Sequence, residues 1–189
     1  MTTTSLALSE ISLTTGEIVR AARHLSIARG YLLETVSGLS PSQWNFRPDS
    51  DSWSIADNLE HLVLIEGRVH AIIGNMINAP EAEPGHEESG MDDFIIGEVP
   101  KRSFKVKASS ISVCPANRWT GPQAVELFIA SREQTMQLLA APLLRGRVMP
   151  HPIFGPWDGY QWLLAVASHS IRHTSQMREV KAHPNFPQA

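Results

Sequence analysis

Four stretches of the chain space their apolar residues in alternating steps of four and three, and this spacing limits the fold more than any other feature. It places the apolar side chains on one face of an α-helix. The stretches run from about Ser9 to Ser37, from Ser54 to about Asn78, from about Gln123 to Ala140, and from near Trp157 to before Pro184. With 189 residues, the chain is long enough for one well-packed domain. The sequence therefore predicts an all-α fold, a four-helix bundle, in a single domain over residues 1–189.

Local signals mark where these helices begin and end. Ser54 and Asp57 have the Ser-x-x-Asp spacing of a capping box, which predicts the start of the second helix. Gly38 and Pro41 interrupt the first helical pattern, and Pro122 suits the first turn of the third helix.

The connection between the second and third helices, residues 79–119, is long and lacks the helical spacing. Its acidic stretch at 81–88 is typical of a solvated loop, and Phe104 to Lys107 alternates like a short strand. We therefore expect a crossover. A connection of this length is either a lid, a substrate-facing element or simple padding, and the sequence leaves these open.

Two histidines, His169 and His173, are four residues apart in the last helix and so lie on the same face. Trp162, Val166 and Gln176 continue the same inward-facing line. Burying two imidazoles side by side is costly unless their ring nitrogens find partners, and a divalent cation satisfies both at once. A catalytic site of the zinc type normally needs three protein ligands, so a third is expected elsewhere.

His61 is the best candidate for the third ligand, because it lies in the capped second helix one position off the apolar line. From spacing alone, two interpretations stay open. Either the three histidines form a metal site, or His61 lies at the core boundary and the other two are an ordinary hydrogen-bonded pair.

Two charged residues interrupt the apolar lines, Arg29 in the first helix and Glu66 in the second. Because buried charges need partners, a contact between them is one hypothesis. The other is that their charged ends reach water.

The composition excludes several classes of protein. A net charge of −3 argues against a general affinity for nucleic acid or anionic membranes. No stretch approaches the roughly 20 apolar residues that span a bilayer. The single cysteine, Cys114, rules out an internal disulfide framework and predicts a reducing, cytoplasmic location.

Several short motifs, taken in order, resemble the DinB-like superfamily of metal-binding bundles. The motifs are Trp53-Ser54-Ile55-Ala56-Asp57, Glu60-His61-Leu62, His151-Pro152-Ile153-Phe154-Gly155, Gln161-Trp162-Leu163, and His169-x-x-Arg172-His173-x-x-Gln176. Each motif is short, but the ordered set spans nearly the whole chain.

The resemblance implies a four-helix bundle whose divalent cation, nickel or zinc, is held by His61, His169 and His173. It also implies a small-molecule substrate, since relatives include transferases and isomerases that use a low-molecular-weight thiol such as bacillithiol or mycothiol. Bundles of this kind often form homodimers, and we expect one here. No separate thiol-binding motif is visible, so either a thiol-dependent transferase or a hydrolase is expected.

Other residues have less specific roles. His151 is a candidate proton shuttle or a local cap of its turn, and Gln176 is a candidate for orienting a ligand ring or touching substrate. Arg172 is expected to face solvent. Four tryptophans either line an apolar pocket mouth or pack the core, and the four remaining histidines are expected to be surface or structural residues. These are Trp44, Trp53, Trp157 and Trp162, and His24, His70, His86 and His183.

Three functional hypotheses follow. The chain is a metal-dependent enzyme, a metal-containing binding or stress-response module without turnover, or a metal-free bundle whose histidines satisfy one another.

Overall fold

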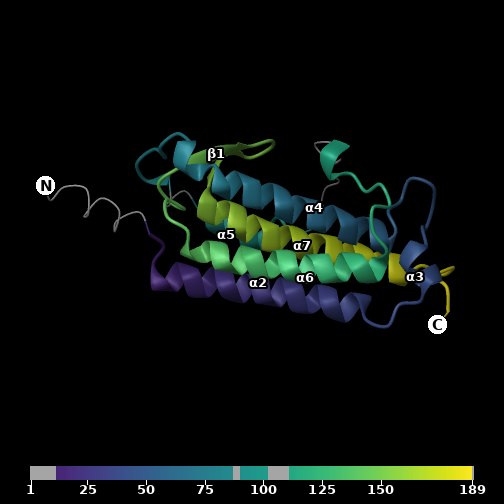
Figure 1. The fold of residues 1–189 in the computed structure, drawn as a ribbon. Coiled ribbons are helices and arrows are strands. Elements are labelled where there is room, and N and C mark those ends of the chain that lie inside the picture. Colours follow the sequence, from purple (N-terminus) through teal and green to yellow (C-terminus); the bar gives the residue numbers. More distant parts are fainter. Residues whose placement is uncertain (1–11, 87–89, 102–110, 189) are drawn as a thin grey trace, which may run out of the picture.

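The computed structural model describes residues 12–86, 90–101 and 111–188, and its four long helices confirm the predicted bundle (Figure 1). They are α2 (Thr15–Val36), α4 (Ile55–Gly74), α6 (Gly121–Gln137) and α7 (Gly159–Lys181). Short 3-10 turns, η1 (Met76–Asn78) and η4 (Leu138–Ala140), follow α4 and α6 and account for their predicted ends. The predicted start of the first helix, at about Ser9, lies outside the described residues.

A capping box opens each of the four long helices. In each, the side chain of the residue before the helix accepts a hydrogen bond from the third helical residue, whose own side chain accepts one in return. The pairs are Thr14 with Glu17, Ser54 with Asp57, Thr120 with Gln123, and Asp158 with Gln161. Only the second of these, Ser54 with Asp57, was predicted from the sequence.

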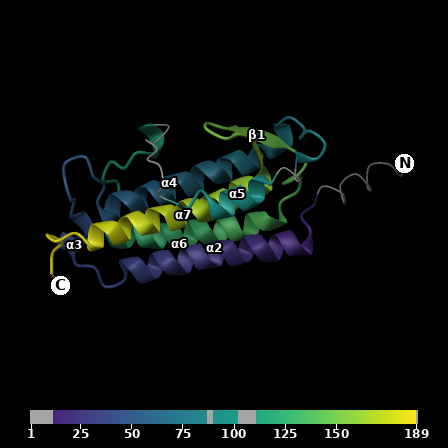
Figure 2. The same ribbon diagram turned by 180° about the vertical axis from the view of Figure 1, so that it is seen from behind.

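The crossover makes α4 and α6 run in the same direction. Figures 1 and 2 show α2 and α7 pointing one way along the bundle and α4 and α6 the other way. The chain therefore returns along the length of the bundle after α4, and residues 79–119 provide this connection as predicted. The return path also brings the crossover's last part beside α4, where it later proves to touch the candidate site.

Several small elements were not predicted. They are the helices α3 (Pro41–Asn45) and α5 (Met91–Gly97), the 3-10 turn η3 (Ile111–Val113), and a hairpin of strands β1 (Val148–His151) and β2 (Gly155–Asp158). Each is too short to repeat a periodic pattern, which explains why the sequence did not reveal them.

The hairpin corrects one predicted boundary. Its strands pair antiparallel, with Met149 opposite Trp157 and His151 opposite Gly155. Gly155 has a φ of 84°, which glycine adopts without strain. Trp157 therefore belongs to β2, and α7 begins two residues later, at Gly159. The strand predicted at Phe104–Lys107 lies outside the described residues.

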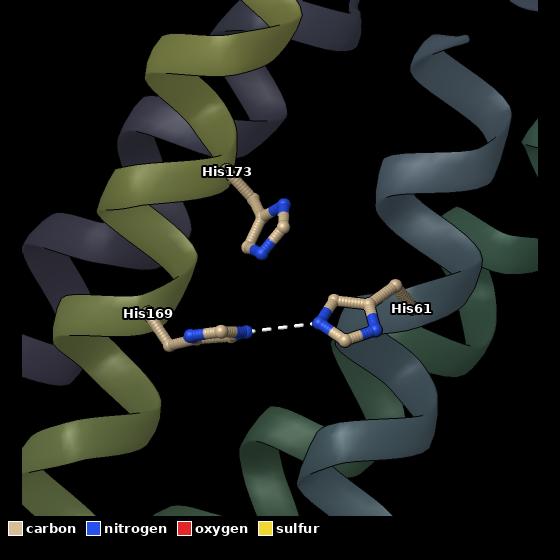
Figure 3. Close-up of side chains that lie close together, drawn as sticks. All are labelled: His61, His169 and His173. Carbon is tan, nitrogen blue, oxygen red and sulfur yellow. Dashed lines mark hydrogen bonds between the residues drawn. The ribbon is translucent and has the colours of Figure 1, made fainter. Parts of the chain in front are cut away.

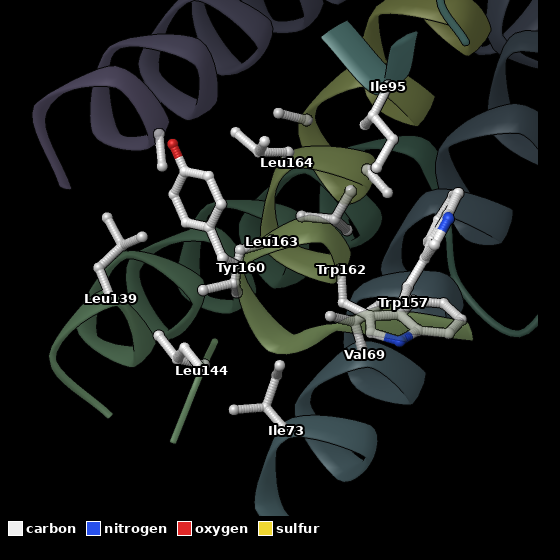
Figure 4. Close-up of a cluster of buried hydrophobic side chains, with 14 of the residues drawn as sticks. Val69, Ile73, Ile95, Leu139, Leu144, Trp157, Tyr160, Trp162, Leu163 and Leu164 are labelled. Atoms are coloured by element: carbon white, nitrogen blue, oxygen red, sulfur yellow. The ribbon is translucent and has the colours of Figure 1, made fainter. Parts of the chain in front are cut away.

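The core consists of two hydrophobic clusters at opposite ends of the bundle. The larger contains Trp157, Tyr160, Leu163 and their neighbours near the hairpin (Figure 4). The smaller contains Trp44, Leu59, Phe128 and their neighbours near α3. Between them lies a buried polar layer, with Glu66 on α4, Arg132 on α6 and Ser170 on α7.

The polar layer shows that the proposed contact between Arg29 and Glu66 is wrong. Glu66 is fully buried and accepts hydrogen bonds from Arg132 and Thr135, whereas Arg29 pairs with Glu133 on the surface. Arg132 falls on the inner line of the third helix, four residues from both Phe128 and Met136, but a charge at such a position does not by itself identify its partner. A charge as deeply buried as Glu66 needs a complete set of partners, and the guanidinium of Arg132 supplies most of it.

Within the described part of the chain, every helix is either too short or too polar to cross a bilayer.

Candidate metal centre

Three histidines from two helices meet on one side of the bundle. His61 projects from α4 toward His169 and His173 on α7 (Figure 3). The Nε2 atoms of His61 and His169 are 3.0 Å apart, and one ring nitrogen from each of the three residues lies within 4.8 Å of the others. The structure therefore brings together the three residues that the sequence analysis named.

The helix geometry explains this meeting. Residues four apart on an α-helix lie one turn above each other, so His169 and His173 face the same neighbour. That neighbour is α4, which packs directly against α7. His61 and His173 are only 4% and 8% exposed, and His169 is partly buried. Trp53, just before α4, contacts the rings of His61 and His173 with centroid distances of 5.0 and 5.8 Å.

Hydrogen bonds determine which ring nitrogen His61 and His173 direct toward the centre of the cluster. His61 Nδ1 lies 2.6 Å from the carbonyl oxygen of Val113, and His173 Nδ1 lies 2.8 Å from Oδ1 of Asn58. The Asn58 amide is oriented by its Nδ2, which donates to the carbonyl of Ser54 at 2.8 Å. Because both acceptors are oxygens, each Nδ1 carries its hydrogen, and in a neutral ring the lone pair is then on Nε2.

Burial favours the neutral form of His61 and His169. It lowers the pKa of His61, although the bond to the Val113 carbonyl opposes this shift. It lowers the pKa of His169 to about 3, helped by the nearby charges of His61, Arg172 and His151. A neutral imidazole is the form that binds a metal ion, so no proton must be removed at pH 7.

The arrangement suits a divalent cation. Without a cation or a proton between them, the facing Nε2 atoms of His61 and His169 would direct lone pairs at each other across 3.0 Å. Three imidazole nitrogens are a common protein ligand set for zinc, nickel and related ions, and in catalytic zinc sites they leave a position for water or substrate. The residues present therefore fit such an ion.

The comparison with known proteins places this geometry in a family. The DinB superfamily matches residues 24–177, a span that includes all three histidines. The chain belongs to the DinB superfamily. It is also similar to the uncharacterized protein YuaE of Bacillus subtilis (strain 168), with 30% identity over 164 residues, which cover 83% of this chain and 96% of YuaE. No solved structure matches.

Sequence reasoning missed two neighbours of the cluster in this DinB bundle, Asn58 and Val113. Asn58 is three residues before His61, on a nearby face of α4, so its polar side chain within a buried helix was a detectable signal. Val113 contributes only a backbone carbonyl from the crossover, and no pattern of side chains could have indicated it.

His151 lies in strand β1, stacked on Trp157 with 3.9 Å between ring centroids. Its Nδ1 accepts hydrogen bonds from the backbone N–H groups of Ile153 and Phe154, both at 3.2 Å. This is the local capping that the sequence analysis gave as one of its two interpretations. Burial, with the charge of Arg68, lowers the pKa of His151 to about 4.

The other residues considered for the site, Gln176, Arg172 and four tryptophans, differ in how close they lie to the histidines of this DinB bundle. Gln176 is partly buried on α7, three residues beyond His173. Arg172 does not simply face solvent, because it is partly buried and its guanidinium donates to the carbonyl of Lys101. Of the four tryptophans named in the sequence analysis, Trp53 contacts the histidine cluster, while Trp44, Trp157 and Trp162 belong to the hydrophobic core.

Three of the remaining histidines bond to buried or partly buried partners. His24 contacts Ser168, His70 contacts Thr135, and His86 contacts Gln161, at 2.8, 2.8 and 3.0 Å. The ring of His183 contacts that of Phe46 in a tilted arrangement, with 5.5 Å between ring centroids. These contacts agree with the structural roles expected for them.

Proposed function

We propose that this protein is a metal-dependent enzyme that holds a divalent cation on Nε2 of His61, His169 and His173. The observation that carries the proposal is the direction of the lone pairs. The Nδ1 atoms of His61 and His173 bond to Val113 and Asn58, so Nε2 is the ring nitrogen that each would offer to a cation beside His169. Zinc and nickel are the proposed ions, because imidazole nitrogen suits both.

A cation held by three neutral ligands keeps its full charge and would lower the pKa of a water or thiol beside it. This chemistry suits transfer of a low-molecular-weight thiol to a small electrophilic substrate, or hydrolysis of that substrate. The chain's own contribution is to orient the imidazoles, keep them unprotonated and limit the access of water through the cover of Trp53.

His151 and Gln176 are proposed to act beside the cation. With Nδ1 of His151 accepting two backbone hydrogen bonds, its neutral ring carries the hydrogen on Nε2. His151 would therefore donate a hydrogen bond to substrate rather than remove a proton. The amide of Gln176 would contact substrate or orient His173 from the next turn of α7.

The alternative is a metal-containing module that binds or senses but does not turn over substrate. The deep burial of His61 and His173 beneath Trp53 favours this version, since a closed centre leaves no position for substrate. The test is to replace the native ion by cobalt(II) and add azide or a small thiol. A changed visible spectrum supports an open position, and an unchanged one supports the closed module.

Metal content tests both versions. We expect near-stoichiometric zinc or nickel in the purified protein after reconstitution, loss of this metal in His173→Ala, and retention in His183→Ala as the control. Absence of metal from the wild-type protein would leave the metal-free bundle as the remaining hypothesis.

The proposal also includes a small-molecule substrate, a cytoplasmic location and a homodimer. Light scattering of the purified protein at several concentrations tests the dimer, since a monomer mass throughout would contradict it.

A further inference from the structure

We infer that Glu60 is a positioning residue of the metal centre, which holds the end of the crossover so that the Val113 carbonyl orients His61. This inference rests on the proposed metal site. It assigns a role to a buried carboxylate outside the three-histidine ligand set and to a loop segment that lies outside the bundle helices.

Glu60 bonds to the end of the crossover at three points. Its Oε1 accepts a hydrogen bond from the backbone N–H of Ala116 at 2.8 Å, and its Oε2 accepts one from the N–H of Arg118 at 3.1 Å. The guanidinium of Arg118 also pairs with Oε1. Asn117, between the two donors, has a φ of 57°, a left-handed conformation that asparagine tolerates, and this bend turns both N–H groups toward one carboxylate.

These contacts continue along the crossover to His61. Arg118 also donates to the carbonyl of Cys114 at 3.0 Å, which fixes the residue directly after Val113. The Val113 side chain is buried, and its carbonyl lies 2.6 Å from His61 Nδ1. Glu60 and His61 are consecutive on α4, so the contacts form a closed circuit from the helix to the crossover and back to the helix.

Burial makes the circuit selective for a carboxylate at position 60. Glu60 is 2% exposed, so water cannot replace a lost partner. A glutamine of the same size keeps one acceptor oxygen but presents an NH2 group where the second backbone N–H must donate. The segment from Val113 to Arg118 would then lose one of its attachments, and the carbonyl would no longer be held against His61.

These contacts predict that metal binding and the position of the Val113–Arg118 segment affect each other. Partners that orient a metal-bound histidine typically change metal affinity 10–100-fold when removed. Because linkage is reciprocal, metal bound at the histidines would in turn hold the Val113–Arg118 segment more firmly.

The experiment compares Glu60→Gln with Asp57→Asn. Asp57 lies one turn earlier on α4 and is equally buried. Its carboxylate pairs with Arg47 at 2.9 Å and accepts hydrogen bonds from Ser54, and it bonds to none of the described residues of the crossover. Zinc affinity is measured by competition with a chromophoric chelator, and unfolding by urea. We expect Glu60→Gln to bind zinc 10–100-fold more weakly at unchanged stoichiometry, and Asp57→Asn to lose stability but keep its affinity within about twofold.

Cys114, the only cysteine in the chain, gives a second readout beside Val113. We expect zinc to slow its alkylation by iodoacetamide in the wild-type protein and to protect it much less in Glu60→Gln. Should Glu60→Gln fail to fold, Arg118→Gln removes only the partly exposed guanidinium and should give a smaller change in the same direction.

The outcomes separate the two proposals. Wild-type protein that binds neither zinc nor nickel overturns the proposed function and this inference together. Wild-type protein that binds zinc while Glu60→Gln binds it equally well overturns this inference alone. Equal loss of affinity in Glu60→Gln and Asp57→Asn also overturns it, because general destabilisation would then explain both.

Discussion

At the residue scale, Asn58 sets the direction of His173. We predict that Asn58→Ala weakens zinc binding about 10–100-fold, because the buried Nδ1–H of His173 loses its acceptor and the ring can turn. Asn75→Ala is the matched control. Asn75, directly after α4, makes the same amide-to-backbone bond, to Ala71 at 2.8 Å, and its side chain bonds to none of the three histidines of the cluster. Competition titration should show normal affinity in this control, and equal affinity in both variants would contradict the assigned role.

A second residue-scale prediction concerns His24 and acid. Burial, with the charges of Arg132 and Arg20, lowers the pKa of His24 from 6.5 to about 4. As the pH falls, His24 therefore takes up a proton near pH 6.5 in the unfolded chain but only near pH 4 in the folded chain. The free energy of unfolding decreases as the pH falls through this window. After discounting for partial exposure, His24 should account for about 1 kcal/mol of stability lost between pH 7 and 5.

Urea unfolding of wild type and His24→Gln at both pH values measures this contribution. Glutamine can still bond to Ser168 but does not titrate, so the variant should lose less stability on acidification. Asp158 acts in the opposite sense, because burial raises its pKa to about 6, but it is present in both proteins and cancels. Identical pH profiles would show that His24 is not the titrating group.

At the element scale, the buried pair of Glu66 and Arg132 ties four helices together. Arg132 bonds to Glu66 on α4, to the Leu25 carbonyl on α2 and to Ser170 on α7. We predict that Arg132→Met destabilises the fold by about 3–5 kcal/mol, because it leaves the carboxylate buried without its cation. Adding Glu66→Met removes that charge and should restore much of the loss. Urea unfolding of the metal-free proteins checks this, and a double variant as unstable as the single one would contradict it.

The elements also show what the sequence could predict. The long helices were predictable because each repeats its apolar spacing over several turns, and α7 placed His169 and His173 on one face for the same reason. The hairpin and α5 were not, since four to seven residues are too few to repeat a pattern. Arg132 was missed because it interrupts the expected inner line of α6, and its partner is known only once α4 and α6 pack together.

At the scale of the whole molecule, the crossover decides which residues meet. Helical periodicity predicted that His61 lies near the interior, but not that α4 would run beside α7 with the last part of the connection above it. The carbonyl of Val113 therefore reaches His61 from 52 positions away in the chain. Backbone groups carry no sequence signal, so contacts of this kind emerge only from the three-dimensional arrangement.

The cation should stabilise the entire fold, because it would join α4 to α7 and bind the folded chain alone. By mass action, zinc at 1,000 times its dissociation constant adds about 4 kcal/mol to the free energy of unfolding. For a domain of this size, each 1 kcal/mol raises the Tm by about 2–4 °C, which predicts an increase of about 8–16 °C. Differential scanning calorimetry with and without zinc measures it, and a chelator should reverse it. His173→Ala should show almost no increase; an equal increase in that variant would locate the stabilising zinc away from the three histidines.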